Sequence, residues 1–140
     1  MKLKKIMVAV DGSDHSMRAA AYASDFAVLG SAEILLVYCR KRLSSILGEP
    51  YLQQAVAEVM EKSNLILEPF REMFREKGVP FSDRILEGSP GNMIAEAARI
   101  ENCDMIIMGS RGRSDFEGLL LGSVTHRVLQ AAECPVLVVR

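Results

Sequence analysis

Paired cysteines and long apolar runs are both missing from this sequence. The three cysteines lie far apart and form no C-x-x-C pair, so neither a zinc site nor a disulfide framework is indicated. No apolar run approaches the roughly 20 residues that a membrane-spanning helix needs. Near the N-terminus the apolar run is five residues long, too short for the core of a signal peptide. We therefore expect a cytoplasmic protein with reduced thiols and no membrane partner.

An excess of charge of one sign is also missing. Seventeen Lys and Arg residues stand against eighteen Asp and Glu residues, which leaves a formal net charge of −1. Proteins that hold nucleic acid electrostatically are usually basic, so the overall charge indicates no nucleic-acid partner. The length of 140 residues and a hydrophobic content of 49% fit one globular domain, which we place over residues 1–140.

Two familiar phosphate-binding motifs are absent. No GxxxxGK[ST] sequence occurs, which argues against a P-loop NTPase. The first apolar run is followed by DGSDHS instead of GxGxxG, which argues against a dinucleotide-binding Rossmann domain. His15 and His126 have no neighbours spaced for metal binding or nucleophile activation, so we assign them no catalytic role.

Short apolar runs alternate with longer amphipathic segments along the whole chain. All-apolar strands separated by helices predict parallel pairing with right-handed crossovers and helices on both faces of the sheet. The expected fold is a doubly wound, Rossmann-like α/β fold with a five-stranded parallel sheet in the order 3-2-1-4-5. The predicted strands cover residues 5–10, 32–39, 80–86, 103–109 and 135–139, and the predicted helices cover 13–30, 51–77, 88–102 and 122–134.

The second predicted helix is unusually long. A straight helix of 27 residues would span roughly 40 Å, which exceeds what we expect of a small domain. Because Pro69 lies inside the segment, we expect a kink there.

The stretch GSRGRSDFEGLLLGS, residues 109–123, lies where a ligand site is expected. Ligands of doubly wound folds bind at the carboxyl ends of the strands, and helix N-termini there favour anions. Gly109 and Gly112 would let the backbone turn and approach a ligand without an intervening Cβ. Gly122 and Ser123 would present amides and a hydroxyl at the start of the last helix. The segment therefore predicts a polyphosphate-binding loop.

The glycine spacing in this stretch follows a third pattern, G-x2-G-x9-G-[ST]. With it, the start KIMVAVDGSDHS and the end LLLGSVTHRVLQAAECPVLVVR, the chain resembles the universal stress protein family, and specifically its ATP-binding branch. The resemblance extends over essentially all 140 residues. It implies an adenine-nucleotide ligand, ATP or else AMP or ADP, with Mg or Mn bridging the phosphates and no dedicated protein metal site.

The resemblance also implies roles for individual residues. Asp11 would contact the ribose or adenine, and the neighbourhood of Val37 would border the adenine. Gly109 and Gly112 would line the ribose and phosphates. The phosphates would be held by Gly122, Ser123 and Val124.

The loop departs from the common family pattern at two acidic positions. Asp115 and Glu117 stand where family members often carry a basic residue, and near a polyanion they would repel it unless they face solvent. Arg111 and Arg113 are either partners for the phosphates or solvated loop charges.

Three functions are compatible with these observations. The leading one is a regulatory module of the stress response, in which the nucleotide changes a surface read by another, unidentified protein. The second is a slow ATPase or other nucleotide-hydrolysing enzyme, although no P-loop lysine and no convincing general base are present, so we do not expect rapid hydrolysis. The third is an interaction or dimerisation module without nucleotide. Residues 135–139 would form an edge strand, which predicts a homodimer through that strand.

Overall fold

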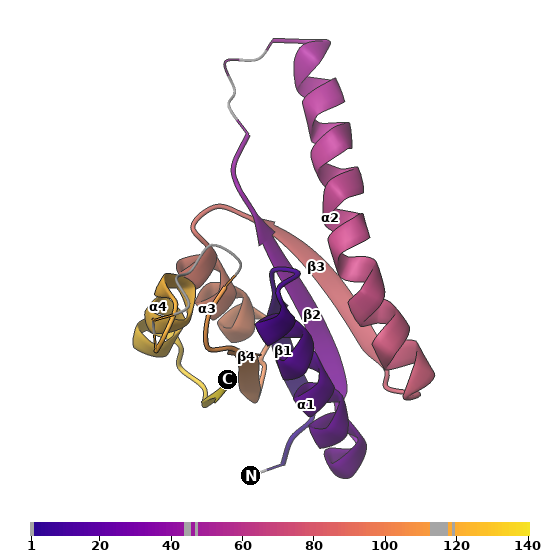
Figure 1. The fold of residues 1–140 in the computed structure, drawn as a ribbon, viewed down its shortest axis with the longest axis vertical. Coiled ribbons are helices and arrows are strands. Elements are labelled where there is room, and N and C mark those ends of the chain that lie inside the picture. The colour runs from indigo at the N-terminus through magenta and orange to yellow at the C-terminus, as the bar shows by residue number, and fades with distance from the viewer. Residues whose placement is uncertain (1, 44–45, 47, 113–117, 119) are drawn as a thin grey trace.

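Five parallel strands alternate with four helices in the described part of the chain (Figure 1). The computed structural model describes residues 2–43, 46, 48–112, 118 and 120–140. The strands are β1 (Lys5–Val10), β2 (Glu33–Arg40), β3 (Phe81–Glu87), β4 (Met105–Gly109) and β5 (Val136–Val139). The helices are α1 (Asp14–Gly30), α2 (Tyr51–Glu76), α3 (Pro90–Ile100) and α4 (Ser123–Ala131).

The strands form one sheet in the order β3-β2-β1-β4-β5, and every neighbouring pair is parallel. Ile6 of β1 aligns with Ile34 of β2 on one side and with Met105 of β4 on the other. This arrangement confirms the predicted topology, with β1 in the centre and β3 and β5 at the edges. The carboxyl ends of β1, β2 and β4 therefore meet at one edge of the sheet.

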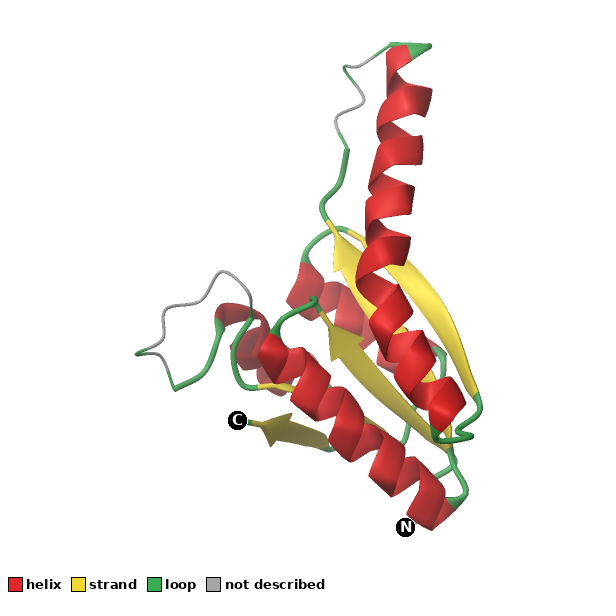
Figure 2. Cartoon of the chain, turned by 45° about the vertical axis from the view of Figure 1, so that its right-hand side comes forward, coloured by secondary structure: helices red, strands yellow, loops and turns green. Residues whose placement is uncertain are grey.

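Each face of the sheet is covered by two helices, because successive side chains of a strand point to opposite faces. Ile6 and Val8 pack with buried side chains of α1 and α2. Met7 and Ala9 pack with buried side chains of α3 and α4. Figure 2 shows α1 and α2 together in front of the sheet, with α3 and α4 behind it.

Side chains and backbone conformation fix the ends of several elements. The sequence predicts Ser13 or Asp14 as the cap of α1; Ser13 takes this position, and its hydroxyl accepts a hydrogen bond from the amide of Ser16 at 3.2 Å. The helix ends at Gly30, as predicted, and the following Ser31 takes the left-handed conformation with φ 52°. Asp104 accepts hydrogen bonds from the amides of Lys4 and Lys5, which ties the start of β1 to the start of β4.

Helix α2 extends beyond the sheet. The structure has one continuous helix through Pro69, and its N-terminal half projects past the carboxyl edge of the sheet (Figures 1 and 2). The expectation that such a helix is too long for the domain is therefore wrong. Its C-terminal half carries the buried core residues Leu67, Phe70 and Phe74, while the projecting half is left to form a wall beside the sheet edge.

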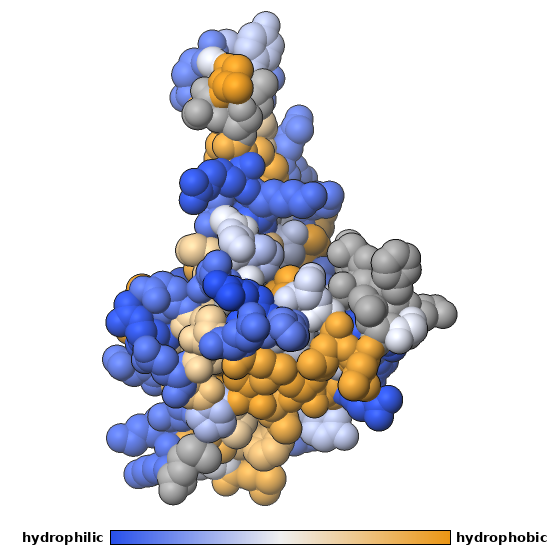
Figure 3. Space-filling view, turned by 90° about the vertical axis from the view of Figure 1, so that its left-hand side faces the viewer, coloured by the Kyte–Doolittle hydropathy of each residue, from blue (hydrophilic) through white to orange (hydrophobic). Residues whose placement is uncertain are grey.

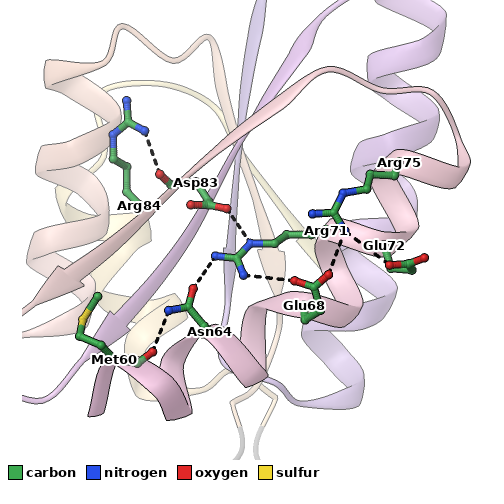
Figure 4. Close-up of polar contacts among 8 residues, drawn as sticks. All are labelled: Met60, Asn64, Glu68, Arg71, Glu72, Arg75, Asp83 and Arg84. Atoms are coloured by element: carbon green, nitrogen blue, oxygen red, sulfur yellow. Dashed lines mark hydrogen bonds and ion pairs between the residues drawn. The ribbon is translucent and has the colours of Figure 1, made fainter. Parts of the chain in front are cut away.

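A polar network joins α2 to the edge strand β3 (Figure 4). The Arg71 guanidinium donates to Asp83 at 2.7 Å, to Asn64 at 2.8 Å and to Glu68 at 3.3 Å. Arg75 binds the other carboxylate oxygen of Glu68 at 2.8 Å. Hydrogen bonds from the two arginines lower the pKa of Glu68. This network ties the C-terminal half of α2 to the edge strand of the sheet.

The structure gives the state of the three cysteines and the apolar length of the described helices. The three cysteines are free thiols, and burial raises the pKa of Cys103 to about 11. None of the helices in the described ranges is both long and apolar enough to cross a membrane.

Candidate nucleotide-binding site

A cavity of about 580 Å³ lies at the carboxyl edge of the sheet. Its floor comes from the ends of β1, β2 and β4, and its sides come from α2, α3 and the start of α4. This is the position at which doubly wound folds bind ligands. The predicted residues among its lining are Asp11, Gly109, Gly112, Ser123 and Val124.

Three hydrogen bonds hold the start of α4 at this cavity. Ser110 donates its amide to the Val139 carbonyl at 2.7 Å, and its own carbonyl accepts from the Gly122 amide at 2.6 Å. The buried Thr125 hydroxyl donates to the Gly109 carbonyl at 2.8 Å. The two ends of the predicted phosphate loop are thus joined at its base, and the first turn of α4 is fixed against the end of β4.

The first turn of α4 presents donors to the cavity. The amides of Ser123, Val124 and Thr125 have no partner inside the helix because they precede its first hydrogen bond, which runs from His126 to the Gly122 carbonyl. The side chain of Ser123 is exposed and lines the cavity. Together with the helix dipole, these groups form a site for an anion.

Gly122 differs from its expected role. It is the N-cap of α4 and is buried, and its amide is already bonded to Ser110. The amides of the segment that have no partner within the helix are therefore those of residues 123–125, which begin one position after Gly122.

Gly109 also serves a purpose other than the expected approach to a ligand. A Cβ on Gly109 would lie 2.7 Å from the Cβ of His15 and 2.9 Å from its carbonyl carbon. Glycine is therefore required there because the start of α1 packs directly on the end of β4. Gly109 still lines the cavity through its backbone.

Asp11 lies in a tight turn between β1 and α1. Its carboxylate accepts a hydrogen bond from the Ser13 amide at 2.9 Å, and Gly12 between them has φ 86°. The turn holds the Asp11 carboxylate at the cavity wall, beside the buried Ser16. Asp11 is the one carboxylate among the described residues that line the cavity.

Val37 lies under the cavity and not on its surface. Its side chain is fully buried in the core that faces α3 and α4. The next two residues of β2, Tyr38 and Cys39, do line the cavity, so the neighbourhood of Val37 borders it as expected. Partial burial raises the pKa of the Cys39 thiol, which donates weakly to the Gly88 carbonyl at 3.6 Å.

Helix α2 supplies a wall that sequence reasoning missed. The cavity is lined from this helix by Val59, Lys62 and Ser63 of the projecting half and by Ile66 just beyond it. The Ser63 hydroxyl is bonded to the Val59 carbonyl at 2.7 Å. The helical periodicity of the segment identified its inner face, but only the three-dimensional arrangement shows that part of this face meets the cavity.

The charged loop residues are only partly described. Arg111 lines the cavity, and burial together with the nearby Arg111 and Arg18 lowers the pKa of His15. Arg113, Asp115 and Glu117 lie outside the described residues, so their predicted influence on phosphate binding is untested. Within the described ranges, no group of three or more His, Cys, Asp or Glu side chains is arranged to hold a metal ion.

Known proteins resemble this chain in sequence along nearly its whole length. The model of the universal stress protein family matches residues 2–140. The "universal stress protein in QAH/OAS sulfhydrylase 3′ region" of Thermus aquaticus is 38% identical over 138 residues, which are 98% of each chain. Universal stress protein MJ0531 of Methanocaldococcus jannaschii is 38% identical over 140 residues, which cover 98% of this chain and 82% of that protein.

Solved structures share this fold over nearly the whole length of the chain. The structure of MJ0577 from Methanocaldococcus jannaschii has a TM-score of 0.88 at 29% identity and covers 99% of this chain and 96% of that one. A universal stress protein in complex with cAMP has a TM-score of 0.79 at 24% identity, with 100% and 99% coverage. One from Archaeoglobus fulgidus in complex with dAMP has a TM-score of 0.75 at 21% identity and covers both chains fully. At these identities, the last two show a shared fold.

Proposed function

Because the chain belongs to the universal stress protein family, we propose that it is a regulatory protein that binds an adenine nucleotide at the carboxyl edge of its sheet. ATP is the leading candidate, with AMP and ADP as alternatives, and residues 1–140 act as one nucleotide-binding unit. The observation that carries the proposal is the first turn of α4, whose first amides have no partner within the helix and lie at the cavity. Proteins of the same fold bind cAMP and dAMP, which supports the same ligand class here.

The phosphates would bind at α4. Hydrogen bonds to a charged group contribute about 1.5 to 3 kcal/mol each. The Ser123 hydroxyl and two or three amides from residues 123–125 would therefore contribute about 4.5 to 12 kcal/mol before the cost of association, and contacts to the ribose and base would add to this. Arg111 and Gly112 would complete this end of the site, and Asp11 would bind the ribose hydroxyls.

A divalent cation would enter with the nucleotide. Magnesium usually keeps several water ligands and binds to proteins through one or two carboxylates and the substrate's phosphates. A cavity with one carboxylate among its described lining residues fits that mode, in which Mg²⁺ or Mn²⁺ bridges phosphate oxygens. We place the protein in the cytoplasm, where its free thiols would stay reduced.

Two substitutions at one position test the phosphate site. Ser123→Ala removes the hydroxyl alone. Ser123→Pro also removes the amide, at the first helical position, where proline is best tolerated. Gly122 already has φ −76° and ψ 163°, a conformation that a following proline accepts.

Calorimetry with AMP, ADP and ATP, each with and without Mg²⁺, provides the measurement. We expect Ser123→Ala to weaken the preferred nucleotide about tenfold and Ser123→Pro to weaken it about tenfold more, with circular dichroism unchanged. The proposal fails if no adenine nucleotide binds the wild-type protein at millimolar concentration, or if both variants bind as tightly as wild type.

The protein would act as a homodimer through β5. In the described chain this strand pairs with β4 on one side and lies at the sheet edge on the other. The space-filling view shows an apolar surface toward this end of the sheet (Figure 3). Residues Val136, Leu137 and Val138 of β5 are only half-buried in the single chain. Two copies paired antiparallel would cover both edges.

The strand register identifies a substitution that addresses this edge alone. Pro135 and Val139 use their carbonyls to bind Ile106 and Ser110 next to β4, so the backbone of Val138 faces the open edge. Val138→Pro therefore removes an outward amide, whereas Val138→Ala keeps it. Light scattering should show a monomer for the proline variant and a dimer for the alanine variant; a proline variant that remains dimeric would exclude this interface.

A short connection between the two sites supports a nucleotide-dependent switch. Ser110 binds β5 through its amide and the N-cap of α4 through its carbonyl. A nucleotide that shifts α4 would therefore act on the edge strand through one residue. We propose that nucleotide binding changes the dimer, or the surface beside it, in a form that a partner protein reads.

A further inference from the structure

The cavity has a positively charged side away from α4. Lys41 follows the end of β2, and Lys62 projects from α2; both line the cavity. In the sheet, β2 and β4 lie on opposite sides of β1. The α4 donors stand on the β4 side, so these two lysines stand across the cavity from them.

The charge of the lysines is not balanced by described residues. Arg40, between them and the sheet, is neutralised by Glu87 at 3.1 Å. Within the described part of the chain, no carboxylate lies within 4.0 Å of the Nζ of Lys41 or Lys62. Arg42 adds charge nearby, since its Nη2 lies 3.8 Å from where a Cβ on Gly88 would be.

Apolar side chains stand beside the two ammonium groups. Leu43, Val59 and Ile66 line the same side of the cavity. A nucleoside can pack on such a surface, while an anionic group attached to it reaches the lysines. A nucleotide whose only phosphates are bound at α4 would leave these lysines without a partner.

We propose that this site selects adenine nucleotides that carry a second phosphate group remote from the first, and that Lys41 and Lys62 bind the second phosphate. The inference rests on the proposed nucleotide function and deepens it. Two ligand types could place phosphate at both ends of the cavity: a nucleotide with a separate further phosphate on its ribose, and two nucleosides joined through one phosphate chain long enough to reach from α4 to the lysines.

Competition with a fluorescent AMP analogue compares three probes: AMP, adenosine 3′,5′-bisphosphate and diadenosine tetraphosphate. Exposed ion pairs contribute little individually, so we expect either adenosine 3′,5′-bisphosphate or diadenosine tetraphosphate to bind about five- to tenfold more tightly than AMP. The preference should fall at high salt because these lysines are exposed. Which of the two probes gains distinguishes the ribose phosphate from the dinucleotide.

The double variant Lys41→Gln, Lys62→Gln should reduce this preference to less than twofold. Lys2→Gln, Lys4→Gln removes the same charge from exposed positions before β1, at the opposite edge of the sheet, and should keep the preference. A preference that survives in the first variant, or no preference in wild type while AMP binds, overturns this inference and leaves the proposed function intact. Failure of all three probes to bind overturns both.

Discussion

Substitution of Gly109 by alanine tests whether α1 packs on the end of β4 as described. The new Cβ would lie 2.7 Å from the Cβ of His15, and carbon atoms pack best at about 3.5 to 4.0 Å. The start of α1 would therefore have to move by roughly 0.8 Å or more. The obstacle includes the backbone of His15, at 2.9 Å, so no change of side-chain rotamer relieves it.

Overpacking of this kind costs about 1 to 3 kcal/mol in unfolding free energy. For a chain of this length, the melting temperature should fall by roughly 3 to 12 °C. The displaced segment includes the turn that holds Asp11, so adenine-nucleotide affinity should fall as well. Urea denaturation and calorimetric titration of the same preparation measure the two effects.

Gly118→Ala is the matched control in the same loop, because a Cβ there would meet nothing within 4 Å. This variant should match wild type in stability. If Gly109→Ala proves as stable as Gly118→Ala, the close approach of α1 is not real, and the reason given for glycine at position 109 is wrong.

Three further predictions concern the fold. Backbone hydrogen bonds from Lys4 and Lys5 lower the pKa of Asp104, so the stabilisation that its carboxylate provides is complete above the unfolded pKa of about 3.9 and is lost as pH falls through the folded value. Asp104→Asn should therefore reduce the unfolding free energy by about 1 kcal/mol at pH 7. In urea titrations at acidic pH, the difference from wild type should vanish. Arg71→Met should destabilise the protein by about 1 kcal/mol, and combination with Asp83→Asn should cost less than the sum of the two, since they share one ion pair. Because the pKa of Cys103 is about 11, only about one Cys103 thiol in a thousand is ionised at pH 8. Iodoacetamide should therefore label Cys103 more slowly than Cys39 when the modified peptides are quantified by mass spectrometry. Equal labelling rates would contradict the burial of Cys103.

The sheet could be predicted from the sequence because its signal is local. Buried parallel strands read as apolar runs, and helices between them fix the direction and hand of each connection. The capping role of Ser13 and the edge position of residues 81–87 followed from the same kind of evidence. The first helix ends at Gly30 as predicted, although the residue in the left-handed conformation after it is Ser31 and not a glycine.

The cavity could be predicted only in part. Glycine spacing identified the loop after β4, but the reason for Gly109 is a tertiary contact with His15, which spacing does not contain. The α2 wall was missed because its residues come from a helix whose length suggested a kink. Which side of an amphipathic helix meets a ligand depends on where the helix ends relative to the sheet, and no local pattern encodes that.

The continuity of α2 limits how relatives can vary at this wall. Its core residues Phe70 and Phe74 fix the rotation of the whole helix, and each residue inserted upstream of them turns everything before it by about 100°. A one-residue insertion between residues 63 and 69 would thus swing Lys62 out of the cavity, whereas seven residues, close to two full turns, would nearly restore its direction. Homologues with altered ligand preference should therefore differ here by substitution, or by length changes near whole turns.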